Sequence, residues 1–188
     1  MKKLLAIMFG LAGLAGTATA ALTANIVLKV LPTGTKSISV STGAVDFGSI
    51  ALGTRAAAAN VSGSSVTVTN IGNIVTTLGL RVSTADGTWT DVAGTTSLVS
   101  VMDQYNLRAL FNGNTAPAAG AFGAAVVTND IRAGAAVLAS GSVYAGAETG
   151  LNVPPSGPTT RGLWFRWDMP DFSSVDTQRQ VTVEVSAN

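Results

Sequence analysis

Apolar and polar side chains alternate at every second position in short segments along this chain, whereas the spacing of an amphipathic helix is almost absent. The last segment is the clearest, because Val181, Val183 and Val185 alternate with hydroxyl or carboxylate side chains. Successive side chains of a strand point to opposite faces, so this pattern predicts strands with one apolar face. The expected strands are residues 26–30, 37–41, 65–70, 78–83, 107–111, 161–168 and 181–186.

Turn residues separate these expected strands. Glycine, often beside Asn or Asp, recurs about every 8–12 residues between Gly43 and Gly113, which is typical of a sandwich or a barrel. We expect a hairpin turn at residues 69–73, where Asn and Gly tolerate a positive φ. The sequence therefore predicts an all-β fold, an antiparallel sandwich of two sheets.

Residues 114–158 have a different composition, rich in Ala, Gly, Ser and Pro. They predict a long excursion before the last two strands, with short strands at residues 124–127 and 142–144. Long excursions of this kind either carry function or serve as plain connections, and both interpretations stay open at this point.

The first twenty residues have the pattern of a secretory signal peptide. Lys2 and Lys3 precede an apolar run from Leu4 to about Leu14, and Ala18-Thr19-Ala20 matches the small-residue cleavage pattern. An uncleaved membrane anchor is the alternative, but the run is shorter than the roughly 20 residues that span a bilayer. We expect cleavage after residue 20, a single sandwich domain over residues 21–188, no later membrane span, and a secreted or surface-associated protein.

The composition excludes several classes of function. The chain has 11 basic and 10 acidic residues, so it lacks the basic surface of a nucleic-acid-binding protein. It contains neither Cys nor His. Disulfides, thiolate or imidazole metal sites, Cys nucleophiles and His-based acid–base catalysis are thereby removed.

Few catalytic groups remain. A glycosidase needs two carboxylates that face each other across a cleft, and Asp168 and Asp171 are the closest pair in the sequence that fits. The simpler interpretation is that they solvate a strand end and the following Pro turn. Lys29 lies on the solvent side of its expected strand and does not suit a Ser–Lys dyad. We expect no enzyme, with a glycoside hydrolase as a weak alternative.

No cofactor is expected, and calcium is the one alternative, because secreted sandwiches bind it through loop oxygens. The candidate ligands lack the dense acidic spacing of a dedicated site, so ordinary turn chemistry is the favoured role. These candidates are Asn112, Asn114, Asn129, Asp130 and Glu148.

Two segments resemble a known family. Residues 45–53 read VDFGSIALG and residues 66–73 read VTVTNIGN. This pattern is similar to bacterial immunoglobulin-like modules of the Hydin-type and major-sperm-protein-like kind, over about residues 37–89. The resemblance implies an immunoglobulin-like sandwich of seven or more strands that serves in scaffolding and surface display, without catalytic residues. Phe47 would be a core aromatic, and the Asn70 side chain would bond the turn that Gly72 completes.

The aromatic segment 161–168 offers a candidate ligand site. Alternation places Leu163, Phe165 and Trp167 on the core face, and Trp164, Arg166 and Asp168 on the other. Trp164 is then either an exposed platform for sugar stacking or a side chain covered by residues 114–158. For Trp89 and Tyr105, the spacing leaves both core and rim positions open.

The shortage of charge is the best functional clue. Only 11% of the residues are charged, and a nearly neutral surface resists self-association poorly. The apolar run 24–31 either forms the first strand of its own sheet or adds to a neighbouring molecule. We expect a secreted, non-enzymatic structural or surface-assembly module that acts through protein–protein contacts, with a carbohydrate-binding or adhesive module using Trp164 as the alternative. Candidate partners are further copies of the chain, other surface proteins, or a glycan.

Overall fold

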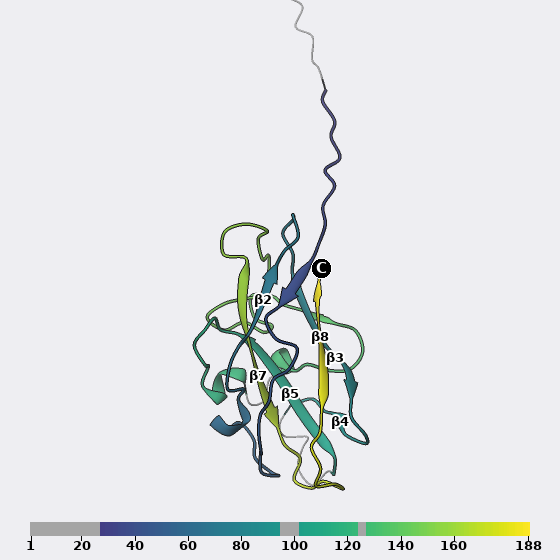
Figure 1. Cartoon of the computed structure of the whole chain (residues 1–188), viewed down its shortest axis with the longest axis vertical. Helices are drawn as coiled ribbons and strands as arrows, with labels where there is room; N and C mark the ends of the chain where they lie inside the picture. Colours follow the sequence, from purple (N-terminus) through teal and green to yellow (C-terminus); the bar gives the residue numbers. More distant parts are fainter. Residues whose placement is uncertain (1–26, 95–101, 124–126) are drawn as a thin grey trace, which may run out of the picture. The chain divides into compact units, whose positions relative to one another are not determined.

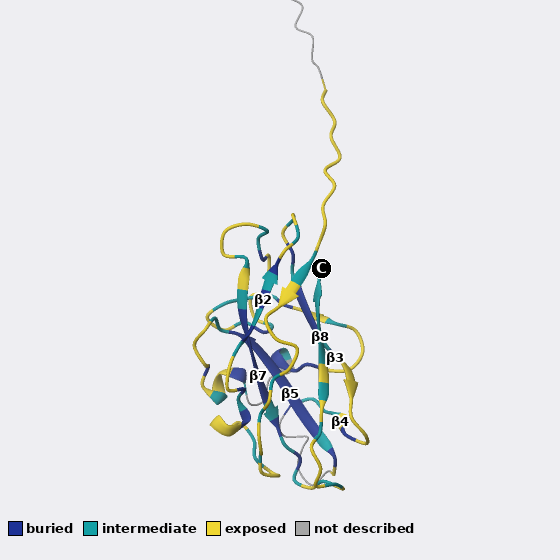
Figure 2. Cartoon of the chain, viewed as in Figure 1, coloured by how far each residue is buried: buried dark blue, intermediate teal, exposed yellow. Residues whose placement is uncertain are grey.

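The computed structural model describes residues 27–94, 102–123 and 127–188. The chain divides into two units, Met1–Pro32 and Thr33–Asn188, and all described strands belong to the second. Within the first unit, residues 27–32 form no regular secondary structure and are exposed, as Figure 2 shows in yellow.

The second unit contains a sheet of five strands and a sheet of three (Figure 1). In the larger sheet, neighbouring strands pair antiparallel except for the last pair, which is parallel. Its spatial order is β1 (Ile38–Val40), β2 (Val66–Asn70), β7 (Thr160–Asp168), β5 (Gln104–Phe111) and β4 (Thr90–Asp91).

The smaller sheet is antiparallel throughout. Its order is β6 (Val137–Leu138), β3 (Leu78–Ala85) and β8 (Val181–Ala187). The β3–β8 register shifts between Val82 and Thr84, which marks a bulge. Helix in the described residues is limited to the 3-10 turns η1 (Ala58–Asn60), η3 (Ala119–Phe122) and η4 (Val127–Asn129). The chain is therefore all-β, as the alternation predicted.

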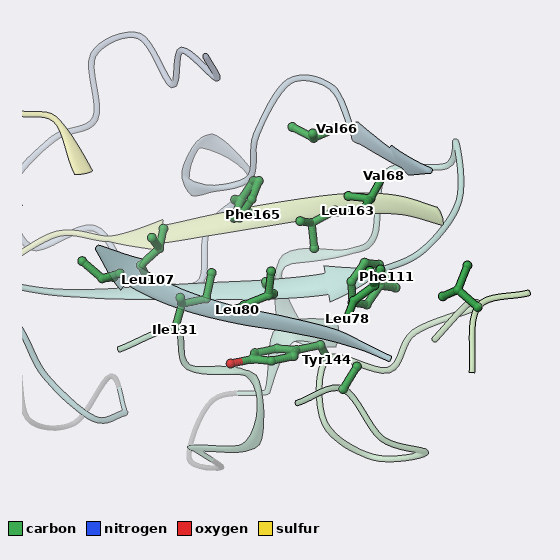
Figure 3. Packing of buried hydrophobic residues seen from close by; sticks show 14 of the residues in the cluster. Val66, Val68, Leu78, Leu80, Leu107, Phe111, Ile131, Tyr144, Leu163 and Phe165 are labelled. Atoms are coloured by element: carbon green, nitrogen blue, oxygen red, sulfur yellow. The ribbon is translucent and has the colours of Figure 1, made fainter. Parts of the chain in front are cut away.

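The hydrophobic core joins the two sheets (Figure 3). Val68, Leu107 and Leu163 enter it from the larger sheet, and Leu78 and Leu80 enter it from β3. Full burial of an aliphatic side chain of this size stabilises the fold by about 1.5–3 kcal/mol. Because the chain has no cysteine, this packing provides the cohesion that disulfides often supply in secreted domains.

An aromatic cluster closes one part of this core. Trp89 stacks on Tyr105, and both rings contact Trp167 at centroid distances of 6.3 and 5.6 Å. Phe47 meets Trp167 edge to face at 5.7 Å, so the core position expected for it is confirmed, although half-buried. Trp89 and Tyr105 therefore belong to the core and not to the rim.

Most expected strands are present, with bounds shifted by up to three residues. Two are wrong: residues 27–30 form no strand, with residue 26 outside the described part, and residues 142–144 form a bend that leads to a single bridge at Ala145. Of the strand expected at 124–127, residues 124–126 lie outside the described part, and Val127 begins η4. The excursion 114–158 contributes one short described strand, β6.

The hairpin expected at residues 69–73 is also wrong, because β2 and β3 lie in different sheets and the turn crosses between them. The turn chemistry itself is confirmed, since the Gly72 amide donates to Asn70 Oδ1 at 2.9 Å. A Cβ at Gly72 would lie 2.3 Å from the Thr35 carbonyl oxygen, so glycine is required there by close approach. Asn70 Nδ2 also donates to the Val153 carbonyl, which ties the crossing to the later excursion.

Strands β5 and β7 are buried on both faces, as Figure 2 shows in dark blue. One face packs on the core between the sheets. The other face lies under η1, η3 and neighbouring loops and holds a second cluster of Leu110, Phe122 and Trp164. In the described part of the chain, no helix has the length and apolarity needed to cross a membrane.

Candidate functional site

The outer face of β5 and β7 carries the three residues predicted to bind a ligand. The antiparallel register sets Arg108 beside Arg166, Leu110 beside Trp164 and Asn106 beside Asp168. Alternation placed Trp164, Arg166 and Asp168 on one face, and the structure brings them together there. All three are buried.

Arg166 links the sheet to the excursion. Its Nη2 donates to Asp168 Oδ2 at 2.7 Å, and its Nη1 donates to the Ala119 carbonyl at 2.6 Å. The guanidinium also donates to the Gly123 carbonyl at 3.2 Å and lies 5.7 Å from the centre of the Phe122 ring. One side chain therefore holds both ends of η3 against β7.

Arg108 makes contacts of the same kind, to an aspartate and to carbonyl groups of the excursion. Its Nε lies 3.0 Å from Asp130 Oδ1 and donates to Asn106 Oδ1 at 2.7 Å. Its Nη1 donates to the carbonyls of Phe122 and Gly123. Burial lowers the pKa of Arg108 below its ordinary value, Asp130 and Asp168 oppose this shift, and Arg166 adds to it.

The two arginines and two aspartates form a charge-balanced cluster inside the fold, which we call the arginine cluster (Arg108, Asp130, Arg166 and Asp168). Opposite charges in contact offset much of the cost of removing each from water. Asp130 Oδ2 also accepts from the Gly94 amide, and Asp168 Oδ1 from the Ala56 amide. The cluster therefore fastens several loops to one sheet face.

Trp164 is 4% exposed. Its Nε1 donates to the Gly113 carbonyl at 2.8 Å, and its ring packs with Leu110 and Phe122. Of the two alternatives that alternation left open, the structure shows the one in which the excursion covers this side chain. Ligand binding by Trp164, Arg166 and Asp168 stays a prediction, and their side chains present no surface to a ligand in this arrangement.

Each carboxylate of the pair considered for hydrolysis forms an ion pair with an arginine. Asp168 belongs to the arginine cluster. Asp171 forms an ion pair with Arg55. Each carboxylate therefore has its own cation within the fold.

The loop oxygens weighed for calcium have other partners. Glu148 Oε2 accepts from the amides of Gly113 and Gly162, and Asn129 Oδ1 accepts from the Tyr144 amide. Asn112 Oδ1 accepts from the Ala147 amide, and Asn114 is exposed. Among the described residues, no three acidic side chains gather in a way that suits a metal ion.

Two surface hollows lie elsewhere. One of about 360 Å³ is lined by the ends of β3 and β8, and one of about 290 Å³ lies between residues 58–63 and residues 116–119. The second is lined mostly by Ala, Gly and Ser and carries no charged side chain. Neither contains a residue predicted to bind a ligand.

The most exposed apolar side chains belong to the segment that sequence analysis singled out for strand addition. Val27, Leu28, Val30 and Leu31 are 77–90% exposed. In the folded unit, β8 pairs on one side with β3 and with no other described strand on its other side. Its Val181, Val183 and Val185 are half-buried. Residues 27–31 are thus an exposed, largely apolar segment, and β8 is an edge strand among the described strands.

Sequence analysis missed the arginine cluster as a unit. Alternation places Arg108 and Arg166 on the face opposite the core, which is the available signal. Asp130 comes from a loop, and the carbonyls of residues 119–123 carry no side-chain signature. Asp103 was also missed, although it receives hydrogen bonds from Thr88, Ser173 and Ser174.

Comparison with protein-family models, curated proteins and solved structures found no match to this chain.

Proposed function

We propose that this chain is a secreted, non-enzymatic structural module that assembles through protein–protein contacts. The observation that carries the proposal is the exposure of the apolar residues in 27–31, which the described fold leaves unburied. Apolar surface of this kind gains free energy when a partner covers it. The low charge of the chain adds support, because few like charges oppose close approach of two copies.

The finer description follows the resemblance given above. We propose an immunoglobulin-like module of the bacterial surface-display kind, delivered by the leader at residues 1–20 to the outside of the cell. Two packed sheets with almost no helix are compatible with such a module. The irregular segment 41–57, where the resemblance has its FG motif, lies between β1 and η1.

A non-enzymatic role agrees with the partners of the carboxylates. Asp168 and Asp171 each form an ion pair with an arginine. The carbohydrate-binding alternative draws no support from Trp164, which is covered by the excursion. Assembly is therefore the single function we carry forward.

The proposal is tested by the mass of the mature chain, residues 21–188, in solution. Multi-angle light scattering from about 1 μM to about 1 mM should show a mass that rises with concentration. Because apolar contact drives the association, added salt should weaken it little. A monomer throughout this range would contradict the proposal.

A further inference from the structure

We propose that residues 24–31 of one copy add as a strand to the free edge of β8 in a second copy. This inference rests on the proposed function and specifies the two surfaces through which copies of the chain would assemble. The partner is another copy of this chain, and the contact joins two different surfaces of the molecule.

Strand β8 has backbone groups available for a further strand. Thr77 and Asn188 exchange two backbone hydrogen bonds of 2.8 and 2.9 Å, so they form a hydrogen-bonded pair of the β3–β8 ladder. Such pairs alternate with non-bonded pairs along an antiparallel ladder. The N–H and C=O groups of Val183 and Val185 therefore point away from β3. With seven residues, β8 is also longer than the other free-edged strands among the described residues, β1, β4 and β6.

The inward valines of β8 are less buried than their partners in β3. Leu80 and Val82 of β3 are 0% and 5% exposed, whereas Val185 and Val183, their register partners in β8, are only half-buried. All four side chains face the core between the sheets. Another strand beside β8 would complete the burial of its valines, because inward side chains of neighbouring strands lie in contact.

Residues 24–31 have the length and pattern of that missing strand. Ile26, Leu28 and Val30 alternate with Val27 and Lys29, so one face is wholly apolar. Leu28 and Val30 are each 90% exposed. Against β8 the apolar face would meet the half-buried valines, while the other face would bring Lys29 beside the outward row that holds Glu184. Backbone bonds supply affinity in such strand addition, and alternate side chains supply specificity.

The acceptor is assigned to a second copy because Leu28 and Val30 are exposed in their own chain and few like charges oppose the approach of another copy. Donor segment and acceptor edge are different surfaces, so the contact is head-to-tail. Contacts of this type build open chains unless the rotation closes a ring.

The test compares two double variants of residues 21–188 by sedimentation velocity. Leu28→Lys/Val30→Lys places charge on the face proposed to enter the core, and Val27→Lys/Leu31→Lys places equal charge on the opposite face. We expect the first to weaken self-association at least tenfold (about one decade in Kd) and the second by no more than about threefold. All four positions are exposed and outside the core, so circular dichroism should show unchanged thermal unfolding in both.

The outcomes separate the two proposals. Equal weakening by both variants, or association that survives the first, overturns strand addition and leaves assembly by another surface standing. A wild-type chain that stays monomeric contradicts assembly itself, and strand addition with it.

Mixing wild type with Leu28→Lys/Val30→Lys offers a second readout. The variant keeps the acceptor edge of β8 but lacks a competent donor segment, so an equal amount of it should shorten wild-type assemblies. Unchanged assembly mass after mixing also overturns strand addition.

Discussion

Gly162 shows how closely the turn after β5, at Gly113, approaches β7. A Cβ at this position would lie 2.0 Å from the Gly113 carbonyl oxygen, which is the same oxygen that accepts from Trp164 Nε1. The backbone at Gly113 therefore rests directly on the strand, and a side chain at residue 162 would force the two apart.

Gly162→Ala should lower the free energy of unfolding by about 1–3 kcal/mol, because the added methyl group overpacks this contact. Denaturant unfolding followed by tryptophan fluorescence measures the change. Gly63→Ala is the matched control, since an added Cβ there meets nothing within 4 Å and its free energy should change by less than about 0.5 kcal/mol. Equal losses in the two variants would contradict the close approach.

Asp103 gives the molecule an acid-sensitive contact. Hydrogen bonds from the Ser174 hydroxyl and amide, with further bonds from Thr88 and Ser173, lower its pKa from 3.8 to about 2. A carboxyl with a lowered pKa in the folded state adds stability above its unfolded pKa and loses it as the pH falls through the folded value.

Wild-type stability should therefore decline between about pH 4 and about pH 2, and part of that decline should disappear in Asp103→Asn. Asp103→Asn should also be less stable than wild type at pH 7, because a neutral amide accepts these bonds less strongly. Urea unfolding at a series of pH values measures both effects. A variant curve parallel to that of wild type would show that Asp103 does not carry this dependence.

At the scale of elements, η3 is held to the larger sheet by two arginine side chains and by the packing of Phe122 on Leu110 and Trp164. Arg166→Met should lower the free energy of unfolding by about 3–5 kcal/mol, because it leaves Asp168 buried without its cation. Amide exchange at residues 119–123 should rise in the same variant.

Arg81→Met is the control for that prediction. Arg81 pairs with Glu184 at 2.5 Å, but both side chains are about two-fifths exposed, at 39% and 43%. Loss of an exposed pair should cost less than about 1 kcal/mol. Comparable losses of unfolding free energy in Arg81→Met and Arg166→Met would contradict the larger cost expected for the buried ion pair.

Elements were predictable where their signal is local. The alternation of β8, β7 and β5 lies within each strand, and in β7 it assigned Leu163 and Phe165 correctly to the core. Pairing depends on distant segments, so the crossing at residues 69–73 was taken for a hairpin and the parallel β4–β5 pair was missed. The arginine cluster was beyond prediction for the same reason, since Asp130 reaches Arg108 through folding of a loop.

At the scale of the whole molecule, the chain has apolar residues outside its core, since those of segment 27–31 are exposed. The pattern of this segment is that of a strand, but a pattern carries no information about which chain supplies the partner. The sequence therefore leaves open whether the segment pairs within its own chain or with a neighbouring molecule. In the structure, Leu28 and Val30 are exposed. The β-sheet content itself followed from composition and periodicity alone.

The exposed stretch before β1 has a practical consequence for chemical labelling. Beyond residue 20, the only lysines of the sequence are Lys29 and Lys36, and both are exposed. Residues 37–188 contain no primary amine. An acylating dye, or a surface that carries an activated ester, would therefore attach to the segment before Ser37, the N-terminal arm, and leave the strands unmodified. Slower acylation of Lys29 than of Lys36 at high protein concentration would report engagement of the arm without any mutation.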